Sequence, residues 1–255
     1  MLSSRVIPSL LLSGAGLVKT VRFAEPKYVG DPRNAVKIFN EKEVDELVLL
    51  DIRATRDGVA PRVELIREVL SEAFMPVSYG GGIRTVGQAG AVLSAGVEKI
   101  VVASAAVEVP GLVSELAREF GSQSVIVCLD VRHDMLRGDR VYVRGGTVRT
   151  DLRPAEFARK VAGWGAGEIL VNAIHRDGRR EGYDLDLIRS VVEAVGVPVV
   201  ACGGAGSLGD LRAAVADAGA SAACAGSLFV FRGKHRAVLI DYPTAAELKA
   251  IGLKA

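Results

Sequence analysis

The sequence predicts a (β/α)₈ barrel, and three observations support this fold class. Eight short apolar runs alternate with segments of helical periodicity. Continuously apolar strands that alternate with helices are typical of a parallel sheet covered by helices on its outer face. Two of the runs end in matching glycine-rich turns. The chain of 255 residues also has the size expected for eight strand–helix units.

The predicted strands lie at residues 6–12, 47–52, 76–79, 100–103, 125–131, 169–173, 197–202 and 222–225. The predicted helices lie at residues 31–42, 63–72, 86–95, 109–120, 155–164, 185–195 and 208–217. A doubly wound open sheet is the competing architecture, but no Gly-x-Gly-x-x-Gly turn follows the first strand. No linker composition interrupts the chain, so we predict a single barrel domain over residues 1–255.

The chain also has the pattern of two half-barrels. Asp45-Glu46-Leu47 and the apolar run after it match Gly167-Glu168-Ile169, 122 positions later. The segment at residues 103–106 matches residues 225–228 at the same spacing. Strands three and four therefore correspond to strands seven and eight. The alternative is that the repeat reflects ancestry alone, with one surviving site.

The two glycine-rich turns indicate phosphate binding. They are Gly80-Gly81-Gly82-Ile83-Arg84 and Gly203-Gly204-Ala205-Gly206-Ser207, and each lies between a strand and a helix. Glycine lets the backbone approach an anion closely, and the helix that follows directs free N–H groups toward it. One such run could be only a tight turn. Two, on opposite sides of one barrel mouth, suit a ligand with a phosphate at each end.

Composition excludes several other classes of function. A formal net charge of +2 gives no support to binding of nucleic acid or of a membrane surface. The first apolar run is too short to span a membrane and lacks a signal-peptide pattern. Cys128, Cys202 and Cys224 lie in apolar runs, which favours buried thiols in a cytoplasmic protein over disulfides or metal ligands. We predict no cofactor and, because His133 and His235 lack partners at ligand spacing, no metal.

Chemistry in such barrels lies at the carboxyl ends of the strands. The ionisable residues predicted there are Asp51, Asp130, His175 and Asp177. Apolar neighbours should raise the pKa of Asp130, which suits a general acid or base, although a structural hydrogen-bond acceptor is the alternative. His175 is expected to be a loop residue, because nothing pairs it with a nucleophile.

Residues 13–31 are predicted to form a long polar loop after the first strand. Loops of this length in a compact domain are usually functional. Lys19 in this loop could close over an anionic ligand, or it could be a solvated surface lysine.

Charged residues stand at four strand starts, on the opposite rim of the predicted barrel. They are Arg5, Glu46, Lys99 and Glu168. Two positive and two negative charges could close the barrel floor as a neutral ring, since paired charges tolerate burial and single ones do not. Ordinary surface charge at strand starts is the alternative.

Taken together, the motifs resemble the HisF family, the cyclase subunit of imidazole glycerol phosphate synthase. The resemblance runs from Arg5-Val6-Ile7-Pro8 to Phe229-Val230-Phe231. Its most specific pieces are Asp45-Glu46-Leu47, Gly80-Gly81-Gly82-Ile83-Arg84, Gly121-Ser122-Gln123, Trp164-Gly165-Ala166-Gly167-Glu168-Ile169-Leu170, Arg176-Asp177-Gly178, Gly182-Tyr183-Asp184 and Gly203-Gly204-Ala205-Gly206-Ser207. The resemblance implies a barrel that docks a HisH-type glutaminase on its N-terminal face and passes ammonia to a bis-phosphorylated substrate at the other face.

The resemblance also implies roles for individual residues. Arg5, Glu46, Lys99 and Glu168 match the charged gate at the ammonia entrance. Lys19 matches a lysine of a mobile loop. Phosphate contacts are implied for Gly82 and Ser104 on one side, and for Asp177, Gly178, Gly204 and Ser227 on the other.

One catalytic position departs from the family pattern. The family uses two aspartates, at the ends of strands one and five; Asp130 matches the second, but Leu11 occupies the first position. Leucine cannot move a proton, and losing one member of an acid/base pair costs orders of magnitude in rate. Ala103 also replaces an asparagine, and His175 an aspartate.

This combination is similar to the WbuZ-type HisF paralogues of surface-polysaccharide gene clusters. The segments at residues 10–12, 27–32 and 38–47 resemble that subgroup. We therefore expect a barrel that pairs with a HisH-type glutaminase and conducts ammonia, with a sugar amidotransferase as a further partner and an acetamidino sugar as product. The alternatives are a working cyclase (lyase) subunit of histidine biosynthesis and a phosphate-binding barrel without ammonia transfer.

Overall fold

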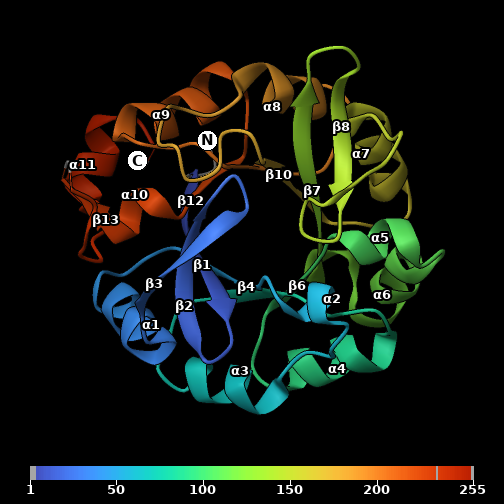
Figure 1. Ribbon diagram of the computed structural model, residues 1–255, viewed down its shortest axis with the longest axis horizontal. Helices are drawn as coiled ribbons and strands as arrows, with labels where there is room; N and C mark the ends of the chain where they lie inside the picture. Colours follow the sequence, from blue (N-terminus) through green and yellow to red (C-terminus); the bar gives the residue numbers. More distant parts are fainter. Residues whose placement is uncertain (1–3, 234, 254–255) are drawn as a thin grey trace.

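The computed structural model describes residues 4–233 and 235–253, and it contains a closed barrel of eight parallel strands (Figure 1). The barrel strands are β1 (Arg5–Ser13), β4 (Leu47–Asp51), β5 (Val77–Gly80), β6 (Lys99–Val102), β7 (Val125–Asp134), β10 (Glu168–Ala173), β11 (Val199–Cys202) and β12 (Ala222–Ala225). Each pairs in parallel with the next, and β12 pairs with β1 to close the ring. The predicted (β/α)₈ barrel is thus confirmed.

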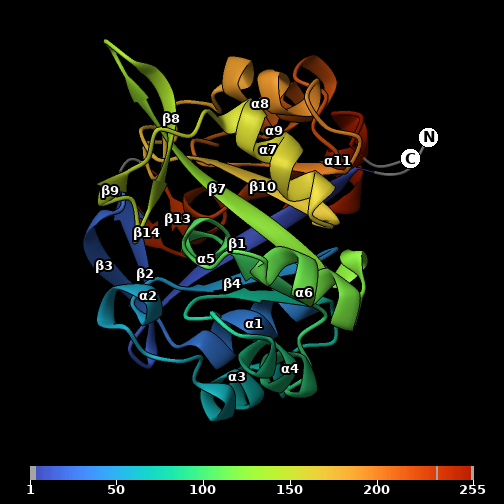
Figure 2. The same cartoon turned by 90° about the vertical axis from the view of Figure 1, so that its right-hand side faces the viewer.

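Helices surround the strands on the outside (Figures 1 and 2). The longer ones are α1 (Pro32–Glu41), α3 (Val63–Leu70), α4 (Val86–Ser94), α6 (Leu112–Phe120), α7 (Pro154–Gly163) and α8 (Leu185–Val192). The shorter ones are α2 (Ala54–Asp57), α5 (Ser104–Glu108), α9 (Leu208–Arg212), α10 (Ser227–Val230) and α11 (Ala245–Ala250). Side chains of Asp31, Thr85, Asp184 and Ser207 cap α1, α4, α8 and α9 by accepting a backbone N–H of the first turn.

Two predicted helices differ from the structure at their ends. The helix expected from residue 109 begins at Leu112, since Pro110 and Gly111 precede it and Gly111 adopts a positive φ of 81°. The helix expected at residues 208–217 is α-helical only to Arg212 and continues as a π-helical turn, Ala213–Asp217. The strand boundaries agree with the prediction to within a few residues.

The buried side chains form two separate apolar clusters. The larger cluster lies between the strands and the helices and includes Phe39, Ile66, Leu116 and Val161. The smaller one fills the barrel interior with side chains of Ile7, Val48, Val101, Ile126, Cys128, Leu170, Val200, Cys202, Ala222 and Cys224. The three cysteines are free and buried, as predicted.

Two hairpins extend from the carboxyl ends of the barrel strands. Strands β2 (Gly16–Val21) and β3 (Ala24–Gly30) pair with each other, and β2 pairs with β1. Strand β8 (Gly138–Val143) pairs with the extended end of β7 and with β9 (Val148–Arg149), and this hairpin projects beyond the barrel in Figure 2. A further short pair, β13 (Phe231–Arg232) and β14 (Ala237–Val238), follows α10.

The first hairpin corrects the prediction of a long polar loop at residues 13–31. Leu17, Val18 and Val29 are buried in this segment, so the hairpin has an apolar side that packs on the barrel. Charged residues elsewhere in it masked that alternation in the sequence. Within the described part of the chain, no helix is both long and apolar enough to cross a membrane.

Candidate active site and charged ring

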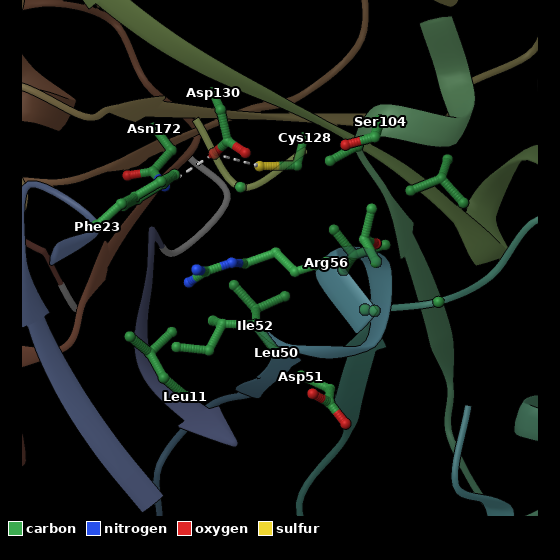
Figure 3. A pocket seen from close by; sticks show the side chains of 18 of the residues that line it. Leu11, Phe23, Leu50, Asp51, Ile52, Arg56, Ser104, Cys128, Asp130 and Asn172 are labelled. Carbon is green, nitrogen blue, oxygen red and sulfur yellow. Dashed lines mark hydrogen bonds between the residues drawn. The ribbon is translucent and has the colours of Figure 1, made fainter. Parts of the chain in front are cut away.

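A pocket opens at the carboxyl ends of the barrel strands (Figure 3). Leu11 from β1, Leu50 from β4, Cys128 from β7 and Asn172 from β10 contribute side chains to its wall. Gly82 and Ser104 lie at one side of this pocket. A second, adjoining cavity shares Leu11, and its wall includes Lys19, Asp177, Gly178, Gly204 and Ser227. The two glycine-rich turns follow β5 and β11, which lie four positions apart around the barrel and therefore face each other across the mouth.

Asp130 is the carboxylate best placed for proton transfer. Its Oδ1 accepts a hydrogen bond from Asn172 Nδ2 at 3.1 Å, and Cys128 Sγ lies 3.7 Å away (Figure 3). Burial raises the pKa of Asp130 to about 6, and the hydrogen bonds from Asn172 and Cys128 oppose that rise only in part. A carboxyl group of this pKa can both accept and donate a proton near neutral pH.

No substitute for a strand-one acid lines the described pocket. Leu11 is in that position, and the other lining carboxylates are Asp51 and Asp177. The Asp51 carboxylate accepts backbone N–H groups of Arg53 and Ala54 and pairs with Arg62 at 2.8 Å. Its carboxylate is therefore engaged by the backbone just before and at the start of α2 and by Arg62.

Asp177 fastens the first hairpin to the barrel. Its carboxylate accepts hydrogen bonds from Thr20 Oγ1 at 3.2 Å and from the backbone N–H groups of Phe23 and Gly178. Its carbonyl oxygen accepts the N–H of Arg22 at 3.0 Å. Burial nevertheless raises the pKa of Asp177, while Lys19 and Thr20 oppose that rise.

Lys19 lies in strand β2 and is buried, which corrects the expectation of a loop lysine and of a solvated one. Its Nζ donates to the carbonyl oxygen of Ser9 at 2.5 Å and sits so close to Gly226 that a Cβ there would collide with it. Burial lowers the pKa of Lys19 to about 8, against the attraction of Asp177. Lys19 thus lines the second cavity, whose wall also includes Ser227 and Gly204.

The other predicted phosphate site, at Gly82 and Ser104, is contacted by the second hairpin. Gly82 adopts a φ of 75°, and a Cβ there would lie 2.6 Å from the carbonyl oxygen of Val59. Ser104 begins α5, and its Oγ accepts the N–H of Arg144 at 2.7 Å. Arg84 and Arg144 both pair with Glu108 beside this end, at 2.9 and 2.7 Å.

His175 has a structural role, as expected for a loop residue. Its Nε2 lies 2.9 Å from Asp184, the N-cap of α8, and this contact lowers the pKa of Asp184. His133 pairs with Asp139, and His235 lies in the turn before β14. Over residues 4–233 and 235–253, no group of three or more His, Cys, Asp or Glu side chains is arranged to hold a metal ion.

The tips of the two hairpins meet above the pocket. Phe23, at the turn between β2 and β3, packs against Gly146 and lines the pocket. Arg22 and Phe23 both have positive φ values, 53° and 65°, which side chains other than glycine, asparagine and aspartate rarely adopt. Phe23 and Asn172 were not predicted as site residues. A lone amide in the apolar run of β10 was the available signal for Asn172, and nothing in the sequence indicated the tight turn at Phe23.

A closed ring of charges lies at the opposite end of the barrel. Glu46 pairs with Arg5 at 2.6 Å and with Lys99 at 3.3 Å, and Glu168 also pairs with both cations. Ser78 Oγ donates a further hydrogen bond to Glu46 at 2.9 Å. The two carboxylates are buried, with side chains 4% and 7% exposed, while the Arg5 side chain is 29% exposed. The structure therefore brings the four predicted residues together in one alternating ring.

Comparison with known proteins agrees with this architecture. The fold and the turns define the class of protein, a (β/α)₈ barrel with two glycine-rich turns that face each other across its mouth. The family model "Histidine biosynthesis protein" matches residues 5–236. A Pseudomonas aeruginosa protein named provisionally as imidazole glycerol phosphate synthase subunit hisF2 is 51% identical over 97% of this chain and 99% of its own. A provisionally named HisF subunit of Leptospira interrogans is 47% identical over 98% and 99%. The HisF subunit of Alkaliphilus metalliredigens is 39% identical over 90% and 91%. The chain belongs to the HisF family.

Proposed function

We propose that this chain is the barrel subunit of a glutamine-dependent complex. A HisH-type glutaminase binds its N-terminal face, and ammonia passes through the barrel to a phosphorylated acceptor, for amidation of a surface-polysaccharide sugar. The charged ring carries this proposal. Its four residues have no role in the pocket chemistry at the far end, yet they close the barrel floor with buried carboxylates.

The barrel interior supports the conduction step. Between the ring and Asp130, the interior cluster consists of apolar side chains and thiols, with small residues such as Ala222 and Cys224 among them. Such a lining offers no strong hydrogen-bond partner that would hold a small neutral molecule.

The departure at Leu11 supports a specialised role rather than cyclisation. Asp51 and Asp177 are both occupied by other partners, so neither replaces the missing strand-one acid. Relatives designated hisF2 and hisF3, at 51% and 49% identity, are consistent with a branch of additional HisF proteins.

A working cyclase subunit of histidine biosynthesis is the second candidate. The environment of Asp130 favours it, because Asn172 and burial adjust this carboxyl group for acid/base chemistry. The names of the relatives refer to imidazole glycerol phosphate synthase as well.

One assay separates the two candidates. The purified chain is mixed with the bis-phosphorylated cyclase substrate and excess ammonium salt, which bypasses the glutaminase. We expect turnover lower than that of a HisF with both aspartates by at least about 100-fold, because one acid/base group is missing. Turnover at the ordinary rate would overturn the sugar-amidation proposal in favour of the cyclase, and Leu11→Asp serves as the matched variant for recovery.

A further inference from the structure

We propose that Arg56 is a specificity-determining residue of the pocket and binds an oxyanion of the ligand, a carboxylate or a phosphate, in addition to the two glycine-rich ends. This inference rests on the proposed function in that the pocket takes a phosphorylated ligand. Arg56 is on α2, lines the pocket, and extends across it with its guanidinium group between Asp130 and Leu11 in the view of Figure 3.

Around the pocket mouth, three carboxylates among the described residues pair with arginines other than Arg56. Asp57 pairs with Arg53 at 2.9 Å, and Asp51 pairs with Arg62 at 2.8 Å. Glu108 is shared by Arg84 and Arg144. Each of these three carboxylates is therefore already engaged by another arginine. Among the described residues, the Arg56 side chain forms no hydrogen bond or ion pair.

Arg56 is exposed at the pocket mouth, and its surroundings there favour contact with an anion. Leu11, Phe23, Leu50 and Ile52 form an apolar wall in the same pocket, and ion pairs near apolar walls are less screened than those in bulk water. The Arg56 stem packs beside Gly145 of the second hairpin, with Cδ 3.4 Å from where a Cβ of that glycine would lie. The planar guanidinium fork matches the two oxygens of a carboxylate or phosphate.

The position of Arg56 suggests where on the ligand this anion lies. The glycine-rich ends flank the mouth. Arg56 lines the pocket together with Gly82 and Ser104, and its side chain points across the pocket, away from that end, in the view of Figure 3. The oxyanion is therefore predicted on the ligand's middle portion. A sugar phosphate that carries a carboxylate or a second phosphate on its ring has the required chemistry.

The test measures calorimetric binding to the full chain. The probes are glucose 1-phosphate, glucuronic acid 1-phosphate, which differs by one carboxylate, and glucose 1,6-bisphosphate, with inorganic phosphate measured separately. We expect the native chain to bind at least one doubly anionic probe about tenfold or more tightly than glucose 1-phosphate, as befits a charge-assisted pair. Arg56→Gln should abolish that preference and leave glucose 1-phosphate binding within about twofold.

Arg53→Gln is the matched control on the same helix, since Arg53 pairs with Asp57 and does not line the pocket. It should keep the preference, and unchanged melting curves would show that both variants fold. Three outcomes would overturn the inference. The native chain could bind all three sugar phosphates equally, it could bind neither doubly anionic probe, or the preference could survive in Arg56→Gln. If inorganic phosphate does not bind, that result would instead contradict the phosphate sites at the two glycine-rich turns, on which the proposed function rests.

Discussion

The raised pKa of Asp130 makes the free energy of unfolding depend on pH. The Asp130 carboxyl group is held among apolar strand residues, and its pKa rises to about 6 from an ordinary value near 3.9. The folded chain then holds more protons than the unfolded chain between about pH 4 and 6. Ionised Asp130 consequently opposes folding, and the free energy of unfolding falls as pH rises through that window.

Asp130→Asn should therefore stabilise the chain at pH 8 by about 1–2 kcal/mol, a value reduced for the partial exposure of the side chain. At pH 4 the gain should disappear, because the native carboxyl group is then neutral as well. Denaturant unfolding at both pH values checks this. Asp151→Asn, whose side chain is 96% exposed, is the control and should show no such pH-dependent difference. Equal effects of Asp130→Asn at the two pH values would contradict the argument.

The location of a single residue in the barrel was predictable where it follows from the residue's place along a strand. The four ring charges fall at strand starts, and Asp130 lies near the end of the parallel-paired part of β7, so an eight-strand pattern was enough to group them. The engagement of Asp51 by Arg62 and of Asp177 by Thr20 was not predictable, because these contacts join segments of the chain through side-chain directions. Arg56 stands out only after its neighbours' partners are known.

At the scale of elements, the first hairpin was the largest error of prediction. Lys19, Glu25 and Lys27 interrupt the apolar pattern of its strands. Its turn uses Arg22 and Phe23 where an Asn-Gly pair is usual. Anchoring by Asp177 holds this turn against its unfavourable backbone geometry. Barrel strands and outer helices were predictable because their apolar periodicity is long and regular.

Arg22→Asn should stabilise the chain by about 0.5–1 kcal/mol, since asparagine tolerates the positive φ of this exposed turn better than arginine does. Thermal melting measures the gain. Arg22→Gln removes the same charge without that tolerance and should melt with the native chain. If both variants gain equally, repulsion between charges rather than backbone geometry is the cause.

At the scale of the whole molecule, the ring and the pocket occupy opposite ends of one barrel. Coupling between them is the property that the proposed complex requires. The ring is closed in this structure, with each carboxylate held by both cations. Passage from the N-terminal face therefore needs at least one of these pairs to separate, for which a docked partner is the natural agent.

Lys99→Ala and Glu46→Ala should each change the coupling between a bound HisH-type glutaminase and ammonia delivery by about tenfold or more. Either change leaves the buried ring with an unbalanced charge, two of one sign against one of the other, and opens or distorts it. The measurement compares glutamine hydrolysis with ammonia that escapes to solvent. Arg33→Ala, which breaks an exposed ion pair with Glu72, is the control. Unchanged coupling in both ring variants would sink the gate proposal.

The apolar interior of the barrel has one more consequence, for the protonation of whatever crosses it. A cation that left the ring would lose its hydration among side chains such as Val48, Leu170 and Val200. Among the residues that the structure describes, the interior cluster offers it no counter-charge before Asp130. The solvation cost for a bare ion in such surroundings is on the order of tens of kcal/mol. Such a barrel would admit ammonia and reject ammonium. Each nitrogen delivered would then leave one proton on the side from which it came.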